Sequence, residues 1–312
     1  MRDRSVVRAL RICAALLMGA AASPAWAQAP ASGLDPAAFL AEQRCSDGAL
    51  EVAEPGCPGA AAQTGVLPMK MRRHDWPGRN AGPDGYQVED SFVADDGQSF
   101  VTTMGFAPFG AFDVSRGDGG EVYVVDGAGA RIAATQDGGQ RGVVQGFYGA
   151  GCGGTGWILF GRDAPTGRWA EVVARLKGRP IPNDCMANSS ALTRYRLETT
   201  AIPFLIDGKP VTVTRPTIIS EHYNAPTLDR ARAMERFFMV QGVGRAIWEA
   251  WTREGFGGPP GDDLDVRCPG TAWSTPPGPG WRLVDCRYAT NIRPADGFAG
   301  DDYNWPPDLT LP

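Results

Sequence analysis

Residues 217–251 have the sequence TIISEHYNAPTLDRARAMERFFMVQGVGRAIWEAW. Two apolar runs, at residues 237–240 and 246–251, lie on either side of the short turn Gly242-Val243-Gly244. Glycine adopts left-handed backbone conformations without steric cost, so this pattern predicts a β-hairpin. Apolar side chains fall on both faces of the first arm, which predicts that this strand lies inside a sheet and not at its edge.

Two more strands are expected directly before the hairpin, at residues 197–206 and 211–219, with a Gly- and Pro-containing turn between them. The alternation Val-Thr-Val-Thr at the start of the second is typical of a half-buried strand. Asn224 and Pro226 follow soon after. We therefore expect this strand to end near residue 219 and to deliver Glu221-His222-Tyr223 to a loop.

The rest of the chain has a similar β pattern, rich in glycine and proline (41 Gly, 26 Pro), which disfavours long helices. Regularly spaced short strands predict a mainly β fold, a β-sandwich of which the jelly roll is one form, with a few short helices. Helices are expected only at residues 34–43 and 168–176, and residues 227–234 fit either one helical turn or a surface loop. The further strands are expected at residues 87–94, 99–104, 120–125, 130–135, 143–148 and 156–160.

Residues 1–27 have the features of a secretory signal peptide: four arginines, a short apolar run and an Ala-Trp-Ala end. The run is too short for a permanent membrane anchor, so we expect cleavage and a periplasmic or extracellular product without an integral membrane segment. Loss of four Arg and one Asp changes the formal charge from −5 to −8. An acidic chain of this kind is a poor partner for nucleic acid.

Beyond the signal peptide, residues 28–66 are expected to form an N-terminal helix and a disulfide-pinned loop. Residues 67–312 are expected to form a single β-sandwich domain. An even number of cysteines in an exported chain predicts disulfides, three in this case, and 15 pairings are open. Pairing of neighbours is the expected arrangement, with the last pair in a C-terminal extension: Cys45–Cys57, Cys152–Cys185 and Cys268–Cys286.

The first candidate site is Glu221-His222-Tyr223, where adjacent acid, base and phenol groups would serve catalysis. Neighbouring residues of a strand point to opposite faces, so Glu221 and His222 converge only if the strand ends there. The alternative is that His222 is a hydrogen-bonded structural residue.

A second candidate is a set of glutamates, because glycoside cleavage needs two carboxyl groups across a sugar. Glu235 and Glu249 lie near and within the two hairpin arms and would be cross-strand neighbours. The alternative is a surface ion-pair set with Arg236 and Arg245. Glu235 completes the predicted catalytic set.

Arg194 and Arg196 lie beside a tyrosine in the segment TRYRLE (193–198) and would bind the carboxylate of a uronic acid. Together with Ser220-Glu221-His222 and the hairpin, this order resembles the motifs of secreted alginate-lyase-type jelly rolls. It departs from them at Gln241 and Gly244, where those enzymes have a basic residue and a tyrosine. The sequence therefore does not assign the chain to that family. The predicted substrate-binding residues are Arg194, Arg196, Glu198, Gln241, Arg245 and Trp248.

Nine tryptophans are an additional signal, because carbohydrate sites use exposed aromatic faces, although most tryptophans in a sandwich belong to the core. Trp273 and Trp281, in a Pro- and Gly-rich region, are expected to be exposed.

From these features we expect an exported protein that engages a polysaccharide or another glycan of the cell envelope. A polysaccharide-cleaving glycosidase or lyase that uses Glu221, His222 and Tyr223 is the first alternative. A structural or assembly protein without a small ligand is the second. The sequence predicts no cofactor and no metal ion, and it leaves the oligomeric state open.

Overall fold

The structure of the protein, a computed structural model, describes residues 33–47, 49–62, 70–74, 85–93, 99–108, 119–136, 144–146, 157–176, 189–206, 209–257, 275–288 and 291–294. These residues belong to one compact unit that begins at Gly33. The prediction of a mainly β chain is confirmed, since one four-residue helix accompanies many strands. Within the described ranges, no helix has the length and apolar character that crossing a membrane requires.

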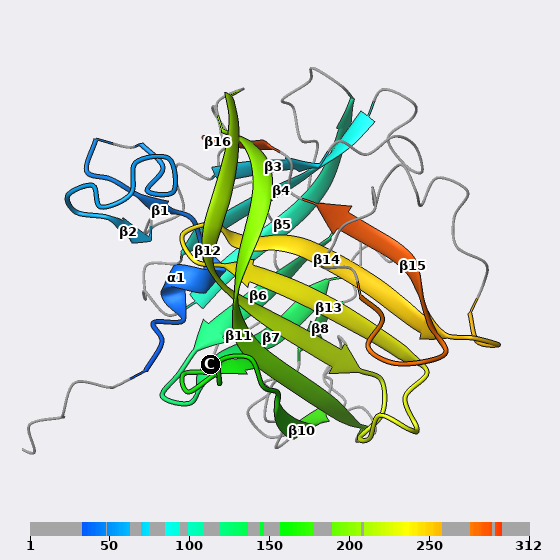
Figure 1. The fold of residues 1–312 in the computed structure, drawn as a ribbon. Coiled ribbons are helices and arrows are strands. Elements are labelled where there is room, and N and C mark those ends of the chain that lie inside the picture. Colours follow the sequence, from blue (N-terminus) through cyan, green and yellow to red (C-terminus); the bar gives the residue numbers. More distant parts are fainter. Residues whose placement is uncertain are drawn as a thin grey trace, which may run out of the picture. The chain divides into compact units, whose positions relative to one another are not determined.

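The secondary-structure elements follow one another along the chain as labelled in Figure 1. They are α1 (Ala37–Leu40), β1 (Gln43–Arg44), β2 (Ala61–Ala62), β3 (Lys70–His74), β4 (Gly85–Val93), β5 (Ser99–Pro108), β6 (Gly119–Val125), β7 (Gly129–Gln136), β8 (Val144–Gly146), β9 (Trp157–Gly161), β10 (Ala170–Leu176), β11 (Ser189–Ile206), β12 (Lys209–Tyr223), β13 (Ala233–Val240), β14 (Gly244–Arg253), β15 (Trp281–Tyr288) and β16 (Asn291–Pro294).

Apart from the small β1–β2 pair, the strands form one 14-stranded sheet. Its order is β15-β14-β13-β12-β11-β16-β3-β4-β5-β6-β7-β8, with β10 beside β11 and β9 beside β7. The described pairings are antiparallel except that β11 and β16 run in parallel. Figure 1 shows the long strands β11 and β12 extending past β13 toward β16.

The predicted hairpin is confirmed as β13 and β14, and β13 lies inside the sheet between β12 and β14. Gly242 and Gly244 have φ values of 78° and 87°, in the left-handed region that favours glycine. A Cβ on Gly244 would also lie 3.0 Å from the carbonyl oxygen of Leu40, because α1 packs against this turn. Glycine is thus required there both by the turn and by the neighbouring segment.

Strand β12 differs from the prediction at its end. It continues to Tyr223 instead of ending near residue 219, so Glu221-His222-Tyr223 lies within a strand and not in a loop. The physical reason is pairing on both sides, because His222 faces Thr193 of β11 and Glu235 of β13 in the register. Backbone groups that are paired with two neighbours stay in the ladder even when Asn and Pro follow.

Of the two predicted helices, one is absent and the other is shorter than predicted. Residues 168–176 form strand β10, not a helix, and pair with β11 from Ala170 to Leu176. Val172 and Val173 are 38% and 52% exposed, so the helix-like spacing of the apolar residues corresponds to no buried helical face. At residues 34–43 a helix does form, but only over Ala37–Leu40, and its C-cap residue Ala41 is already extended.

The core of β11–β14 has two faces of different composition. One face carries Ile218, Phe237 and Tyr195 and packs in one cluster with residues of β6, β7 and β9. The other carries two separate apolar clusters, one around Ile219 and Phe238 and one around Tyr223, Met234 and Trp251. The strip of sheet between these two clusters is occupied by charged side chains.

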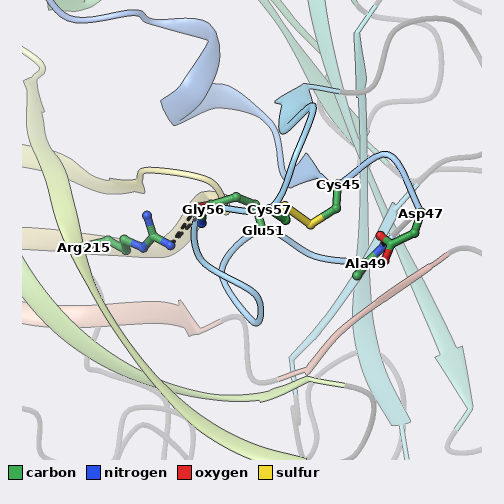
Figure 2. The surroundings of a disulfide bond; sticks show 7 residues. All are labelled: Cys45, Asp47, Ala49, Glu51, Gly56, Cys57 and Arg215. Atoms are coloured by element: carbon green, nitrogen blue, oxygen red, sulfur yellow. Dashed lines mark hydrogen bonds and ion pairs between the residues drawn. A yellow bond between two sulfur atoms is a disulfide. The ribbon is translucent and has the colours of Figure 1, made fainter.

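One disulfide is described, Cys45–Cys57, which confirms the first of the three predicted pairs (Figure 2). It closes a loop that also contains Glu51, and Figure 2 shows Glu51 bound to Arg215 of β12, with an N–O distance of 3.0 Å. Cys286 is disulfide-bonded as well. Cys152, Cys185 and Cys268 lie outside the described residues, so the other two pairings stay predictions.

Replacing both Cys45 and Cys57 with alanine is expected to lower the free energy of unfolding by about 2–3 kcal/mol, because a bridge with a sequence separation of 12 restricts the unfolded chain. Urea unfolding followed by circular dichroism measures this loss. The substitution of Asp47, an exposed residue of the same loop, by alanine is the control. A loss below about 0.5 kcal/mol in the double variant would contradict the prediction.

Candidate functional site

Strand β12 separates the three residues of the predicted catalytic motif. Side chains alternate along a strand, so Glu221 and Tyr223 lie on one face of the sheet and His222 lies on the other. The hydroxyl of Tyr223 donates to Glu221 Oε2 at 2.5 Å, which confirms that these two side chains share a face. The His222 ring stacks instead on Trp157, with ring centroids 4.7 Å apart. The structure therefore brings together only two of the three residues.

On the Glu221 face, four ionisable residues form a row across β11, β12, β13 and β14. Each is the direct cross-strand partner of the next: Arg194 faces Glu221, Glu221 faces Arg236 and Arg236 faces Glu249. We call Arg194, Glu221, Arg236 and Glu249 the charged row. Its charges alternate in sign and sum to zero, which is the arrangement that favours cross-strand pairing.

The charged row is closely hydrogen-bonded. Arg236 donates to Glu221 Oε1 through Nε at 2.9 Å and Nη2 at 2.7 Å, and through Nη1 to Glu249 Oε2 at 3.0 Å. Arg194 Nε donates to Glu221 Oε2. Trp251 Nε1 also donates to Glu249 Oε2, at 2.8 Å. Burial and the nearby Glu221 carboxylate raise the pKa of Tyr223, which therefore stays a neutral donor.

The charged row also holds a backbone segment against the sheet. Arg236 Nη1 donates to the carbonyl oxygen of Thr275 at 2.8 Å, and Arg194 Nη2 donates to that of Pro277 at 3.4 Å. A cavity of about 120 Å³ remains between this segment and the sheet. Trp169 lies between two guanidinium groups there, 4.5 Å from Arg194 and 4.2 Å from Arg196.

These bonds occupy the groups that catalysis or carboxylate binding would need. Glu221 and Glu249 are 0% exposed, and Arg236 is 4% exposed. Both oxygens of Glu221 accept bonds from guanidinium groups. We conclude that the charged row ties the strands and residues 275–277 together. The ion-pair alternative is confirmed for Glu249 and Arg236, although the pair is buried and not on the surface.

On the opposite face, His222 is buried and neutral. Ser220 Oγ donates to the carbonyl oxygen of Leu159 at 2.6 Å and lies 3.0 Å from His222 Nε2. Because Ser220 Oγ donates its one proton to Leu159, it can only accept a hydrogen bond from His222. Nε2 of His222 must therefore carry a proton and donate it to Ser220 Oγ. Nδ1 then has only a lone pair and has no hydrogen-bond partner in the described part of the chain. Burial lowers the pKa of His222 to about 3.

His222 also lines a cavity of about 620 Å³, which we call the tryptophan cavity. This volume is typical of pockets that bind small ligands. Trp157 and Trp248 are half-buried in its wall, and Trp248 Nε1 donates to Glu235 Oε1 at 3.3 Å. The described lining residues are Trp157, His222, Asn224, Ala233, Met234, Glu235, Trp248, Ala250, Trp251, Thr252, Gly257, Val284 and Asp285.

The cavity lies over another cross-strand row. His222 faces Glu235, Glu235 faces Ala250 and Ala250 faces Asp285, on β12, β13, β14 and β15. The small side chain of Ala250 thus lies between two carboxylates. Among the described lining residues, these carboxylates are the charged groups, and none is Lys or Arg. The described lining of the cavity thus combines aromatic rings with two carboxylates.

Of the predicted site residues, the tryptophan cavity gathers His222, Glu235 and Trp248. Arg196 pairs with Glu198 at 2.8 Å on the other face. Two further predicted binding residues lie apart from both places. The backbone N–H of Gln241 donates to Pro216 O at the hairpin turn, and Arg245 Nη1 donates to Tyr123 Oη at 3.2 Å.

Sequence reasoning missed Trp157, Asn224 and Asp285 as cavity residues. Period-2 alternation from His222 already indicates Asn224, because both belong to one face of β12 and its extension. No local pattern indicates Asp285, which depends on the pairing of β15 with β14. The expected exposure of Trp281 is wrong, since it is 8% exposed and its ring contacts Tyr223. Trp273 lies outside the described residues.

Comparisons with protein-family models, curated proteins and solved structures found no match to this chain. No group of three or more His, Cys, Asp or Glu with the geometry of a metal site occurs in the described ranges.

Proposed function

We propose that the protein binds a carbohydrate in the tryptophan cavity. The observation that carries this proposal is the combination of two half-buried tryptophans with Glu235 and Asp285 in one cavity of about 620 Å³. A sugar ring has an apolar face of C–H groups and a rim of hydroxyl groups. Aromatic rings complement the first, and carboxylates accept hydrogen bonds from the second.

The cavity also has features of a preformed site. The ring of His222 is hydrogen-bonded to Ser220 and stacks on Trp157, so it does not need to move when a ligand enters. Trp157 itself donates through Nε1 to Thr193 Oγ1 at 3.0 Å. A binding wall that is ordered beforehand loses little conformational freedom on binding, which favours affinity.

Cleavage of a polysaccharide by Glu221, His222 and Tyr223 is a weaker alternative. Glu221 and Tyr223 are 0% exposed on the face opposite His222, so the three residues cannot contact one substrate. A neutral His222 with a pKa near 3 is also a poor proton acceptor at neutral pH. Binding is the function that this arrangement supports best.

The test is titration of the purified protein with a panel of neutral, acidic and basic oligosaccharides, followed by tryptophan fluorescence and calorimetry. We expect at least one class of oligosaccharide to bind. The substitution Trp248→Ala is expected to raise the Kd for that oligosaccharide about tenfold or more. Trp248→Phe retains an aromatic face but loses the N–H group. Its affinity should lie between that of the unmodified protein and that of Trp248→Ala.

Trp169→Ala is the matched control, because Trp169 lies between arginines on the other face of the sheet. Its affinity should equal that of the unmodified protein. If no oligosaccharide of the panel binds, or if Trp169→Ala and Trp248→Ala weaken binding equally, the tryptophan cavity is not the carbohydrate site.

The proposal includes export of the protein to the periplasm or the extracellular space, and a β-sandwich arrangement of its strands. An exported protein meets envelope glycans, and residues 1–27 support export by their signal-peptide pattern. A disulfide between Cys45 and Cys57 is consistent with an oxidising compartment. For the sandwich arrangement, support comes from the cluster in which β7 and β9 pack against β12 and β13.

A further inference from the structure

Strand β10 has a neighbouring strand on only one side in the described part of the chain. It pairs with β11 along Ala170–Leu176, and no second strand pairs with it there (Figure 1). Its contact with β9 is through the core, where Ala174 belongs to the same cluster as Leu159 and Phe160. The other edge of β10 therefore presents backbone N–H and C=O groups that can pair with a further strand.

The side chains at the centre of β10 are apolar and exposed. Val172 and Val173 are 38% and 52% exposed and point to opposite faces of the sheet. They are two of the three large apolar side chains that are exposed among the described residues. Proteins commonly protect an edge strand with lysine, proline or a bulge, and β10, with the sequence AEVVARL, has none of these three. This edge is therefore suited to strand pairing.

The two charged residues of β10 indicate which strand fits this edge. If two copies of β10 pair in antiparallel fashion around a two-fold axis at Val173, Glu171 of each copy lies opposite Arg175 of the other. Val173 then lies opposite itself. Opposite charges and β-branched residues at facing positions stabilise an antiparallel pair, and both charged side chains are exposed. Arg175 already interacts within its own chain, but a guanidinium group has five N–H donors and can bind a second carboxylate.

The neighbouring registers do not give this match. An axis at Val172 places Glu171 opposite Val173, and an axis at Ala174 places Arg175 opposite Val173. The axis at Val173 instead forms two Glu–Arg pairs, one on each side of a valine pair. Because identical patches meet in a two-fold dimer, a strand that matches itself in this way fits a second copy of the same chain.

We propose that the protein forms a two-fold dimer through β10, in which the two strands pair in antiparallel fashion around Val173 and join the sheets of both copies. No residue of β10 is among the described lining residues of the tryptophan cavity. The inference therefore does not depend on the proposed carbohydrate function.

Sedimentation equilibrium of the purified protein over a series of concentrations measures the dissociation constant of the dimer. Val173→Lys brings two lysines together at the axis and should raise this constant about tenfold or more. Thr214→Lys is the matched control, because it adds the same charge at an exposed position of β12 and should leave the constant unchanged. A monomer at every concentration up to about 1 mM, or equal dissociation constants for the two variants, overturns the proposal.

Charge reversal tests whether Glu171 and Arg175 face each other. Glu171→Lys places like charges opposite one another at two positions and should raise the dissociation constant about tenfold, and Arg175→Glu should do the same. The double variant should return to within about threefold of the unmodified protein. A double variant that dimerises as weakly as the single variants contradicts the pairing. Thermal unfolding verifies that each variant is folded.

A cysteine at the axis tests the register directly. Facing residues of an antiparallel pair have Cα atoms about 4.5–5.5 Å apart, which suits a disulfide, so Val173→Cys should form covalent dimers with oxidised glutathione. Val172→Cys is the matched control, because its two copies would be diagonal neighbours about 7–8 Å apart and should form few. Equal yields of covalent dimer from the two variants overturn the pairing of β10 with itself around Val173.

Discussion

Replacing Glu221 with glutamine is expected to lower the free energy of unfolding by about 3–5 kcal/mol, the cost of removing one partner from a buried ion pair. Glu221 is 0% exposed and accepts hydrogen bonds from Arg194, Arg236 and Tyr223. A neutral amide leaves two buried guanidinium groups, Arg194 and Arg236, with Glu249 as the one carboxylate that remains in the charged row. It also places an NH2 group where two donors already point.

Urea unfolding followed by tryptophan fluorescence measures this effect. The matched control is Glu198→Gln, because Glu198 pairs with Arg196 nearby while its side chain is 33% exposed. An exposed pair contributes only about 0–1 kcal/mol, so the control should lose little stability. Equal losses in the two variants would show that the charged row does not stabilise the fold in the way described.

Acidification is expected to destabilise the protein through His222, by on the order of 4 kcal/mol between neutral pH and about pH 3. Burial lowers the pKa of His222 from 6.5 to about 3 in the folded protein. Between these two values the unfolded chain binds a proton that the folded chain does not, so the free energy of unfolding falls as the pH falls. Above about pH 6.5 this contribution is constant.

The groups around His222 explain why the charged ring is disfavoured. Ser220 already donates its proton to Leu159, and the ring packs between Trp157 and Phe237. Glu235, its cross-strand partner, is the ionisable neighbour that would stabilise a charged ring. Burial is the cause that lowers the pKa of His222.

The measurement is the free energy of unfolding of the protein and of His222→Gln from pH 3.5 to pH 8. Other ionisable groups are shared by both proteins, so the difference between the two curves isolates His222. The difference should change with a slope near 1.4 kcal/mol per pH unit below about pH 6 and be flat above about pH 7. Parallel curves would mean that His222 is accessible to protons in the folded state.

Part of the fold could be predicted because its signals are local. The turn at Gly242 and Gly244 needs left-handed backbone, and the apolar runs on both sides fit a strand inside a sheet. Strand β10 shows where such signals fail. Its apolar residues occur at helical spacing, but the backbone groups form their hydrogen bonds with β11, so the segment is a strand.

Only some residues of the candidate site could be predicted from the sequence. Three predicted site residues, His222, Glu235 and Trp248, line the tryptophan cavity. Asp285 lies 63 positions beyond His222 in the chain and enters the cavity through the pairing of β15 with β14. Local patterns hold no information on which distant strands become neighbours.

The sequence by itself determined the turn between β13 and β14 and the two strands on either side of it, since both follow from local backbone geometry. The continuation of β12 to Tyr223, which divides Glu221 from His222, depended on pairing with β11 and β13. Only the tertiary structure decided the order and register of the strands. That register turned Arg194, Glu221, Arg236 and Glu249 into a buried charged row and the opposite face into a tryptophan cavity. The physical reason is that a shift of one residue would exchange the two faces of a strand, and burial of both faces together selects the register.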